Sequence, residues 1–223
     1  IYDGARNITE RRKDIWNTHY DTPKLSGRIT WDPAGDTVAN LGGHYQRIYD
    51  RYYEDGVRIG PGLPDRIRTV YENEDSWNYE VSGDYQFGLG PGKLKLIGLR
   101  RFSHEPYRQE IVTTPAGGIA TGDRFAQTGD IGETIGRGEY QWKMFGGDWQ
   151  LSGEAAFNTL DNVASIAVLD PSGAWVDQPF DGGTGGVSED RYEGLLSFGR
   201  KLTDKLTVQI IAGAEHSTIT QTG

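Results

Sequence analysis

The feature of this sequence that most constrains its fold is a strict alternation of apolar and polar residues over long runs. From Trp77 to Leu89 every odd position is apolar or glycine, while the even positions are polar or glycine. Alternation at period two places the two sets on opposite faces of a β-strand, one apolar and one in water. No window shows a helical period, so the sequence predicts an all-β fold. The pattern recurs in residues 25–31, 139–144, 149–157, 192–199 and 206–214.

The connections between the alternating runs differ in length. Short connections rich in turn residues mark tight hairpins, and they lie at residues 32–36, 90–92, 146–148 and 203–204. The long, polar connections cover residues 55–65, 106–131 and 159–189. Short and long connections in alternation predict an antiparallel up-and-down sheet, with its turns at one rim and its loops at the other. We expect about eight strands, at residues 24–31, 37–54, 66–89, 93–105, 132–145, 148–158, 190–202 and 205–219.

Aromatic residues lie near both ends of the apolar stripes. Eight positions separate Tyr79 from Phe87, which corresponds to about 20 Å of height for a strand tilted by about 40°. An outer-membrane β-barrel carries an apolar band about 25 Å tall between two aromatic girdles. The sequence therefore predicts an antiparallel up-and-down transmembrane β-barrel, with residues 1–223 as a single barrel segment. The rings expected in the girdles are Trp31, Phe87, Trp149 and Phe198 beside the turns, and Tyr79, Phe157 and Tyr192 at the far ends.

The same alternation assigns each side chain to lipid or to the lumen. The residues expected to face lipid are Tyr79, Val81, Phe87, Trp149, Leu151, Ala155 and Phe157. Those expected to line the lumen are Glu80, Asp84, Gln150 and Glu154. In the run from 93 to 102, Arg100 falls on the apolar side, and we expect a β-bulge at Gly98 to re-aim it.

Composition removes several classes of function. The chain of 223 residues contains no Cys and has a net charge of −9. The absence of Cys excludes disulfide scaffolds and thiolate metal sites, and the negative charge argues against nucleic acid as a partner. Phosphate-loop, zinc-helix and nucleophile-elbow patterns are each incomplete, at residues 88–93, 104–108 and 194–199. The sequence therefore predicts no enzyme activity, no cofactor and no metal site.

The most acidic part of the chain contains the candidate ligand contacts. No Lys or Arg lies between Lys143 and Arg191. Within this stretch, the loop 159–189 combines carboxylates with aromatic rings, which suits a cationic, metal-bearing or sugar-like ligand. A solvated, mobile outer loop is the alternative interpretation. The candidate contacts are Asp170, Trp175, Asp177, Phe180 and Asp181.

Basic residues gather elsewhere in the sequence. One group is Arg11, Arg12 and Lys13, and another is Arg47, Arg51 and Arg58. Outside a bacterial membrane, such residues would meet anionic lipopolysaccharide. Ordinary surface charge is the alternative.

Three segments resemble the barrel strands of TonB-dependent outer-membrane receptors: residues 23–33, 77–95 and 191–216. The resemblance implies a barrel fragment at the outer membrane of a Gram-negative cell, with short periplasmic turns and large outer loops. It also implies uptake of a scarce siderophore-, vitamin- or saccharide-like ligand. The implied partners are the lipid bilayer, lipopolysaccharide, the remainder of the parent barrel, and the TonB energy-coupling complex, which would act through a plug domain outside this chain.

Alternatives remain at the level of the sequence. With the short turns in the periplasm, both chain ends fall on the outer side, which predicts a segment of a larger barrel rather than a closed eight-stranded one. A passive porin-like or structural barrel is a second function, and a plug sequence upstream would distinguish the receptor from it. A soluble all-β carbohydrate-binding module is a third, and solubility without detergent would identify it.

Overall fold

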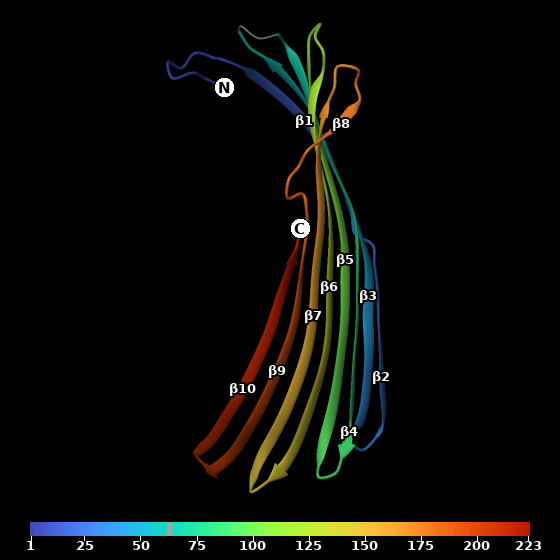
Figure 1. The fold of residues 1–223 in the computed structure, drawn as a ribbon, viewed down its shortest axis with the longest axis vertical. Coiled ribbons are helices and arrows are strands. Elements are labelled where there is room, and N and C mark those ends of the chain that lie inside the picture. The colour runs from blue at the N-terminus through green and yellow to red at the C-terminus, as the bar shows by residue number, and fades with distance from the viewer. Residues whose placement is uncertain (62–63) are drawn as a thin grey trace.

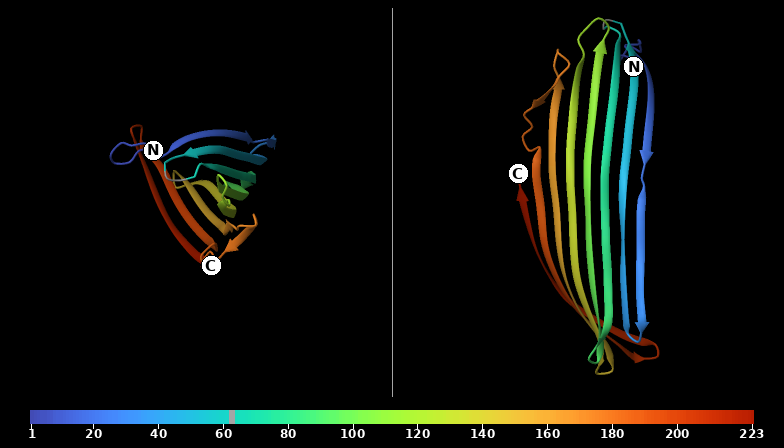
Figure 2. Two further views of the ribbon diagram at one scale, coloured as in Figure 1. Left: turned by 90° about the horizontal axis from the view of Figure 1, so that it is seen from above. Right: turned by 90° about the vertical axis from the view of Figure 1, so that its right-hand side faces the viewer.

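The computed structural model describes residues 1–61 and 64–223 as one curved antiparallel sheet, a single layer thick (Figures 1 and 2). Its spatial order is β1-β3-β4-β5-β6-β7-β9-β10, with β2 paired to β3 and β8 paired to β7. The all-β, antiparallel up-and-down architecture predicted from the sequence is confirmed. The strands are β1 (Arg11–Asp21), β2 (Lys24–Ala34), β3 (Thr37–Ile59), β4 (Arg66–Leu89), β5 (Gly92–Pro115), β6 (Thr121–Met144), β7 (Gly147–Leu169), β8 (Trp175–Gln178), β9 (Thr184–Thr203) and β10 (Leu206–Thr222).

The ten strands make eight long passes, as the sequence predicts. Strands β1 and β2 pair with the upper and lower parts of the same partner, β3, and therefore act as one interrupted strand. The break falls at Thr22 and Pro23, since proline has no N–H to donate to the ladder. The carbonyl of Pro23 still accepts a hydrogen bond of 3.0 Å from the amide of Arg47.

Each of the short connections is a tight hairpin, as predicted. The turn between β6 and β7 consists of Phe145 and Gly146, with φ of 55° and 70°. Two successive residues with positive φ match the right-handed twist of the strands they join. Gly35 and Gly90 supply the positive φ in two of the other turns.

The long connections are shorter than the sequence predicts, and this part of the prediction is wrong. Residues 106–131 are mostly strand, because β5 continues to Pro115 and β6 begins at Thr121. Residues 159–189 likewise contain the end of β7, all of β8 and the start of β9. In the connection expected at 55–65, β3 continues to Ile59, and residues 62 and 63 lie outside the described residues. These extensions mix polar and apolar side chains on both faces, so they lack the period-two signal.

The strand register defines two faces of the sheet. Directly opposed residues in an antiparallel pair point to the same side, so the pairs Tyr85 with Leu96, and Tyr140 with Leu151, share what we name the apolar face. The other side is the polar face, and it carries Glu80, Asp84, Gln150 and Glu154. The predicted division into two sets of side chains is confirmed.

The expected bulge at Gly98 is absent. Gly98 pairs with Gly83 on one side and Gly136 on the other, in an unbroken register. Arg100 therefore stays on the apolar face, opposite Val81 and Thr134.

The sheet is open rather than closed into an eight-stranded barrel. Within the described part of the chain, the outer edge of β10 and the outer edges of β1 and β2 pair with no strand. Seen end-on, the strands form an arc (Figure 2). The free edges present unpaired backbone groups, with which a further strand can pair.

Very little apolar surface is buried. Among the described residues, only Val70, Ala156 and Ala167 are buried hydrophobic residues. Large side chains of the apolar face stand exposed instead, with Leu41 at 55% and Leu151 at 52%.

No helix in residues 1–61 and 64–223 has the length and apolar character needed to cross a membrane.

Candidate functional site

Aromatic rings form two clusters on the apolar face. In the cluster nearer the long connections, Trp77 lies 5.4 Å from Phe102 and 6.3 Å from Tyr45, measured between ring centroids. In the cluster beside the tight turns, Trp149 lies 6.1 Å from Trp142 and 4.7 Å from Phe198. The indole N–H of Trp149 donates to the carbonyl oxygen of Met144 at 3.1 Å. Rings with one apolar and one hydrogen-bonding end suit the boundary between an apolar layer and water.

The polar face is crossed by ion pairs between neighbouring strands. Glu154 of β7 lies 3.0 Å from Arg191 of β9 and 3.6 Å from Arg137 of β6, measured between carboxylate oxygen and guanidinium nitrogen. Asp84 lies 3.4 Å from the Nζ of Lys95. The residues expected to line a lumen therefore include carboxylates that already have cationic partners.

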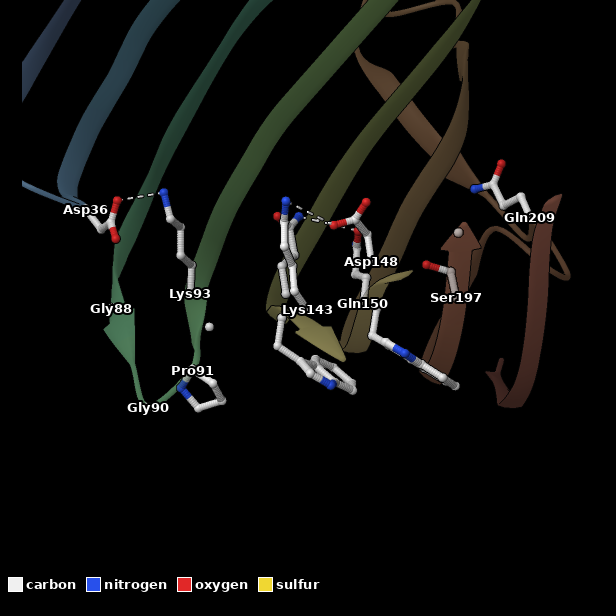
Figure 3. A pocket seen from close by; sticks show the side chains of 15 residues that line it. Asp36, Gly88, Gly90, Pro91, Lys93, Lys143, Asp148, Gln150, Ser197 and Gln209 are labelled. Carbon is white, nitrogen blue, oxygen red and sulfur yellow. Dashed lines mark hydrogen bonds and ion pairs between the residues drawn. The ribbon is translucent and has the colours of Figure 1, made fainter. Parts of the chain in front are cut away.

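A hollow of 620 Å³ lies on the polar face at the end with the tight turns. Figure 3 shows Lys93, Lys143, Asp148, Gln150 and Ser197 around it. The Lys93 ammonium lies 2.6 Å from Asp36, and Lys143 lies 3.7 Å from Asp148. Its residues come from separate strands across the curve of the sheet, so the hollow follows from the curvature.

Asp170, the first of the predicted ligand contacts, organises its own turn. Its Oδ1 accepts hydrogen bonds from the Ser172 hydroxyl at 2.6 Å, from the Ser172 amide at 2.8 Å and from the Ala174 amide at 2.9 Å. These bonds, the Ser172 hydroxyl foremost, lower the pKa of Asp170 below its ordinary value. This oxygen therefore already accepts its hydrogen bonds within the connection between β7 and β8.

Trp175 and Asp177 lie on β8, on the same side of the sheet as the apolar face. They pair with Leu169 and Ala167 of β7. The Arg124 guanidinium lies 4.3 Å from the centre of the Trp175 ring, within the range of a cation–π interaction. Both side chains thus point away from the polar face.

Phe180 and Asp181 lie in the connection between β8 and β9. Both are exposed, and Phe180 retains 43% of its accessible surface. The five predicted contacts share the end of the sheet with the long connections, but the structure does not gather them into one pocket. Their role in ligand binding stays a prediction.

The structure divides the basic residues between the two faces. Register places four of the basic residues on the apolar face: Arg47 directly opposite Trp77 of the aromatic cluster, and Arg11, Lys13 and Arg51 beyond the cluster. Arg47 lies 2.5 Å from Asp75, and Arg51 lies 3.9 Å from the same carboxylate. Arg12 and Arg58 lie on the polar face instead.

Arg12 and Arg58 belong to a cluster that sequence analysis missed, which we name the arginine cluster. It also contains Arg66 and Arg68 of β4, and the four arginines surround three carboxylates at a hollow of 410 Å³. Arg68 lies 3.0 Å from Glu54, which lies 3.6 Å from Arg58. The alternation of Arg66 and Arg68 in the sequence is the signal that they share a face. Their cross-strand neighbours become evident only from the register. The three carboxylates are Glu10, Asp14 and Glu54.

Comparisons with known proteins add little. Neither a family model nor a curated protein matches the sequence. Among solved structures, the chain is similar to BauA, the ferric preacinetobactin receptor of Acinetobacter baumannii, with 9% identity and a TM-score of 0.33. The match covers 94% of this chain and 41% of that receptor, so the chain spans about two fifths of its length. A similarity this weak supports no argument about function.

Proposed function

We propose that this chain forms part of the wall of an outer-membrane β-barrel, and that the complete barrel is an uptake receptor of the TonB-dependent type. The observation that carries the proposal is the exposed apolar face, bounded by aromatic clusters at both ends. Soluble monomers rarely expose contiguous apolar surface larger than a few hundred Å². Lipid is the environment that such a band and its girdles suit.

The polar face supports a barrel over a soluble sandwich. In a sandwich, the inward faces of two sheets pack together around a shared core. Here the described residues form one sheet with almost no buried apolar side chains. Ion pairs such as Arg191–Glu154 cross the face opposite the apolar one. Apolar outside and polar inside is the pattern of a barrel wall around an aqueous interior.

The free edges support a barrel larger than eight passes. Backbone groups in a bilayer must be paired within the protein, so a wall with two open edges is incomplete in lipid. Further strands of the parent barrel would pair with the edges of β10 and of β1 and β2. The free edges of the sheet therefore favour a segment of a larger barrel.

Strand length favours a receptor over a small passive barrel. Strand β4 has 24 residues, which corresponds to about 80 Å of chain, against an apolar band about 25 Å tall. The excess extends beyond the band on the side of the long connections, where ligand capture would take place. The cationic and aromatic groups on the outward side of this extension, among them Arg47 and Arg51, would contact lipopolysaccharide.

Transport measurements in cells test this proposal. Bacteria that produce the complete protein should take up its ligand only when the energy-coupling complex is functional, and the protein should fractionate with the outer membrane. A passive porin-like barrel, the second candidate, predicts uptake that persists without energy coupling. Recovery of the protein in the soluble fraction would contradict both candidates.

A further inference from the structure

We propose that the arginine cluster on the polar face is a binding site for a compact oxyanion, such as a phosphate group carried by a small ligand. The inference is separate from the proposed uptake role, since it depends only on the cluster. Arg12, Arg58 and Arg66 stand side by side on three neighbouring strands: Arg12 is directly opposite Arg58, and Arg58 is directly opposite Arg66.

Three adjacent arginines are an unfavourable arrangement unless anions lie among them. Like charges directly opposite each other destabilise a sheet. The side chain of Arg58 is only 6% exposed, and a buried charge requires partners. Asp14 and Glu54 contact Arg58, while Glu10 contacts Arg12 and Arg66.

The carboxylates present leave the cluster positive. Four guanidinium groups and three carboxylates line the hollow, so its lining carries a charge of +1 in a chain whose net charge is −9. Among residues 1–61 and 64–223, the buried Nη1 of Arg66 has no hydrogen-bond partner. An unsatisfied, buried guanidinium nitrogen is costly, so the carboxylates present do not fully satisfy the cluster.

The space beside these groups suits a small anion. The hollow of 410 Å³ is lined by the cluster and by Thr113, whose hydroxyl can donate a hydrogen bond. Gly56 lies where a Cβ would collide with the side chains of Asp14 and Arg58, so the absence of a side chain keeps these groups in position. Planar guanidinium groups bind tetrahedral and planar oxyanions through paired N–H donors.

The position of the cluster favours a ligand over a lipid headgroup. Register places the arginines on the polar face, the side opposite the apolar band. A lipid phosphate would approach from the other side. The arginine cluster therefore faces the aqueous side of the sheet, at the end that carries the long connections.

Titration calorimetry of the purified protein with inorganic phosphate, at low ionic strength, tests the inference. We expect saturable binding that Arg66→Gln weakens by about tenfold or more, because it removes charge-assisted hydrogen bonds. The matched control is Arg101→Gln, which removes an arginine of the same face that pairs with Glu133 at 2.6 Å outside the cluster. This variant should bind phosphate like the unaltered protein.

A variant that is expected to strengthen phosphate binding distinguishes ligand binding from a purely structural role of the cluster. Glu10→Gln removes a competing anion, so phosphate should bind more tightly. Arg68→Gln provides a second weakening variant if Arg66→Gln does not fold. Absence of saturable binding in the unaltered protein would overturn the inference, as would equal losses in Arg66→Gln and Arg101→Gln. Binding of lipopolysaccharide vesicles through Arg66, with no binding of free phosphate, would also overturn it.

Discussion

Arg100 of β5 donates a hydrogen bond of 2.7 Å to the hydroxyl of Thr134 on β6, on the apolar face of the sheet. It is a cation among apolar side chains, two residues along the strand from the ring of Phe102. Phe102 belongs to the aromatic cluster on the side of the long connections. The guanidinium thus lies beside a boundary of the apolar band, where polar headgroups would be within its reach.

Replacement of Arg100 by leucine should change the free energy of unfolding little. A charge near the interface of a bilayer costs about 0–1 kcal/mol, so its removal gains at most a similar amount. Denaturant titration in lipid vesicles, compared with Thr134→Val, measures the effect. A change of more than about 2 kcal/mol would place Arg100 deeper in the bilayer than the girdle indicates.

Leu41 provides the complementary test at the middle of the band. It lies four residues from Tyr45 on the apolar face and is 55% exposed. Leu41→Arg should cost about 2–4 kcal/mol in a bilayer. The matched control is Ser82→Arg on the adjacent strand, because Ser82 borders a hollow of 420 Å³ on the polar face. Equal costs at the two positions would contradict the assignment of the faces.

The orientation of the sheet predicts which connections are accessible from outside a cell. An epitope inserted at Gly118, between β5 and β6, should bind antibody on intact bacteria. The same epitope inserted at Asp204, between β9 and β10, should bind only after the outer membrane is opened. If antibody bound only the epitope at Asp204 on intact cells, the sheet would have the opposite orientation in the membrane.

Acidification should loosen the N-terminal edge of the sheet. The hydrogen bond from Arg12, supported by the nearby charges of Arg66 and Arg58, lowers the pKa of Glu10 below its ordinary value of 4.5. A group whose pKa is lowered by folding stabilises the fold above its unfolded pKa, and this contribution is lost as the pH falls through the folded pKa. Amide hydrogen exchange in β1 should therefore accelerate below about pH 4.

The variant Glu10→Gln provides the control for this acid response. It has no carboxylate to titrate at this position, so β1 should exchange at a rate that depends less on acidification, after correction for the intrinsic rate. The same acid response in both proteins would show that another group controls this edge.

The sequence predicts the fold well where one face of a strand is apolar and the other polar. Strand β4 matches its expected bounds, and the four hairpins lie at their predicted turns. The sequence does not predict strand β1, because its residues form no clean alternation. Trp16, Asn17, His19 and Tyr20 give neither face a consistently apolar or a consistently polar character. Beyond the apolar band both faces contact water, so burial imposes no period on the sequence.

The candidate sites, too, could be predicted from the sequence only in part, because local patterns do not show which distant residues meet. Composition alone identified the acidic connection that contains Asp170 and Trp175, but it did not indicate that Trp175 stacks with Arg124. The arginine cluster joins Arg12 with Arg66, which are 54 positions apart, through the register of β1, β3 and β4. Long-range pairing of this kind is set by how strands align, which local sequence patterns specify only weakly.

The claim that the apolar face contacts lipid can be tested directly by spin labelling in vesicles. The chain contains no Cys, so single cysteines can be introduced without background labelling. Successive positions from Trp149 to Phe157 should alternate: labels at odd positions should be relaxed more strongly by oxygen, and those at even positions by a water-soluble nickel chelate. Uniform access to the nickel chelate along this stretch of β7, with no period of two, would contradict the account.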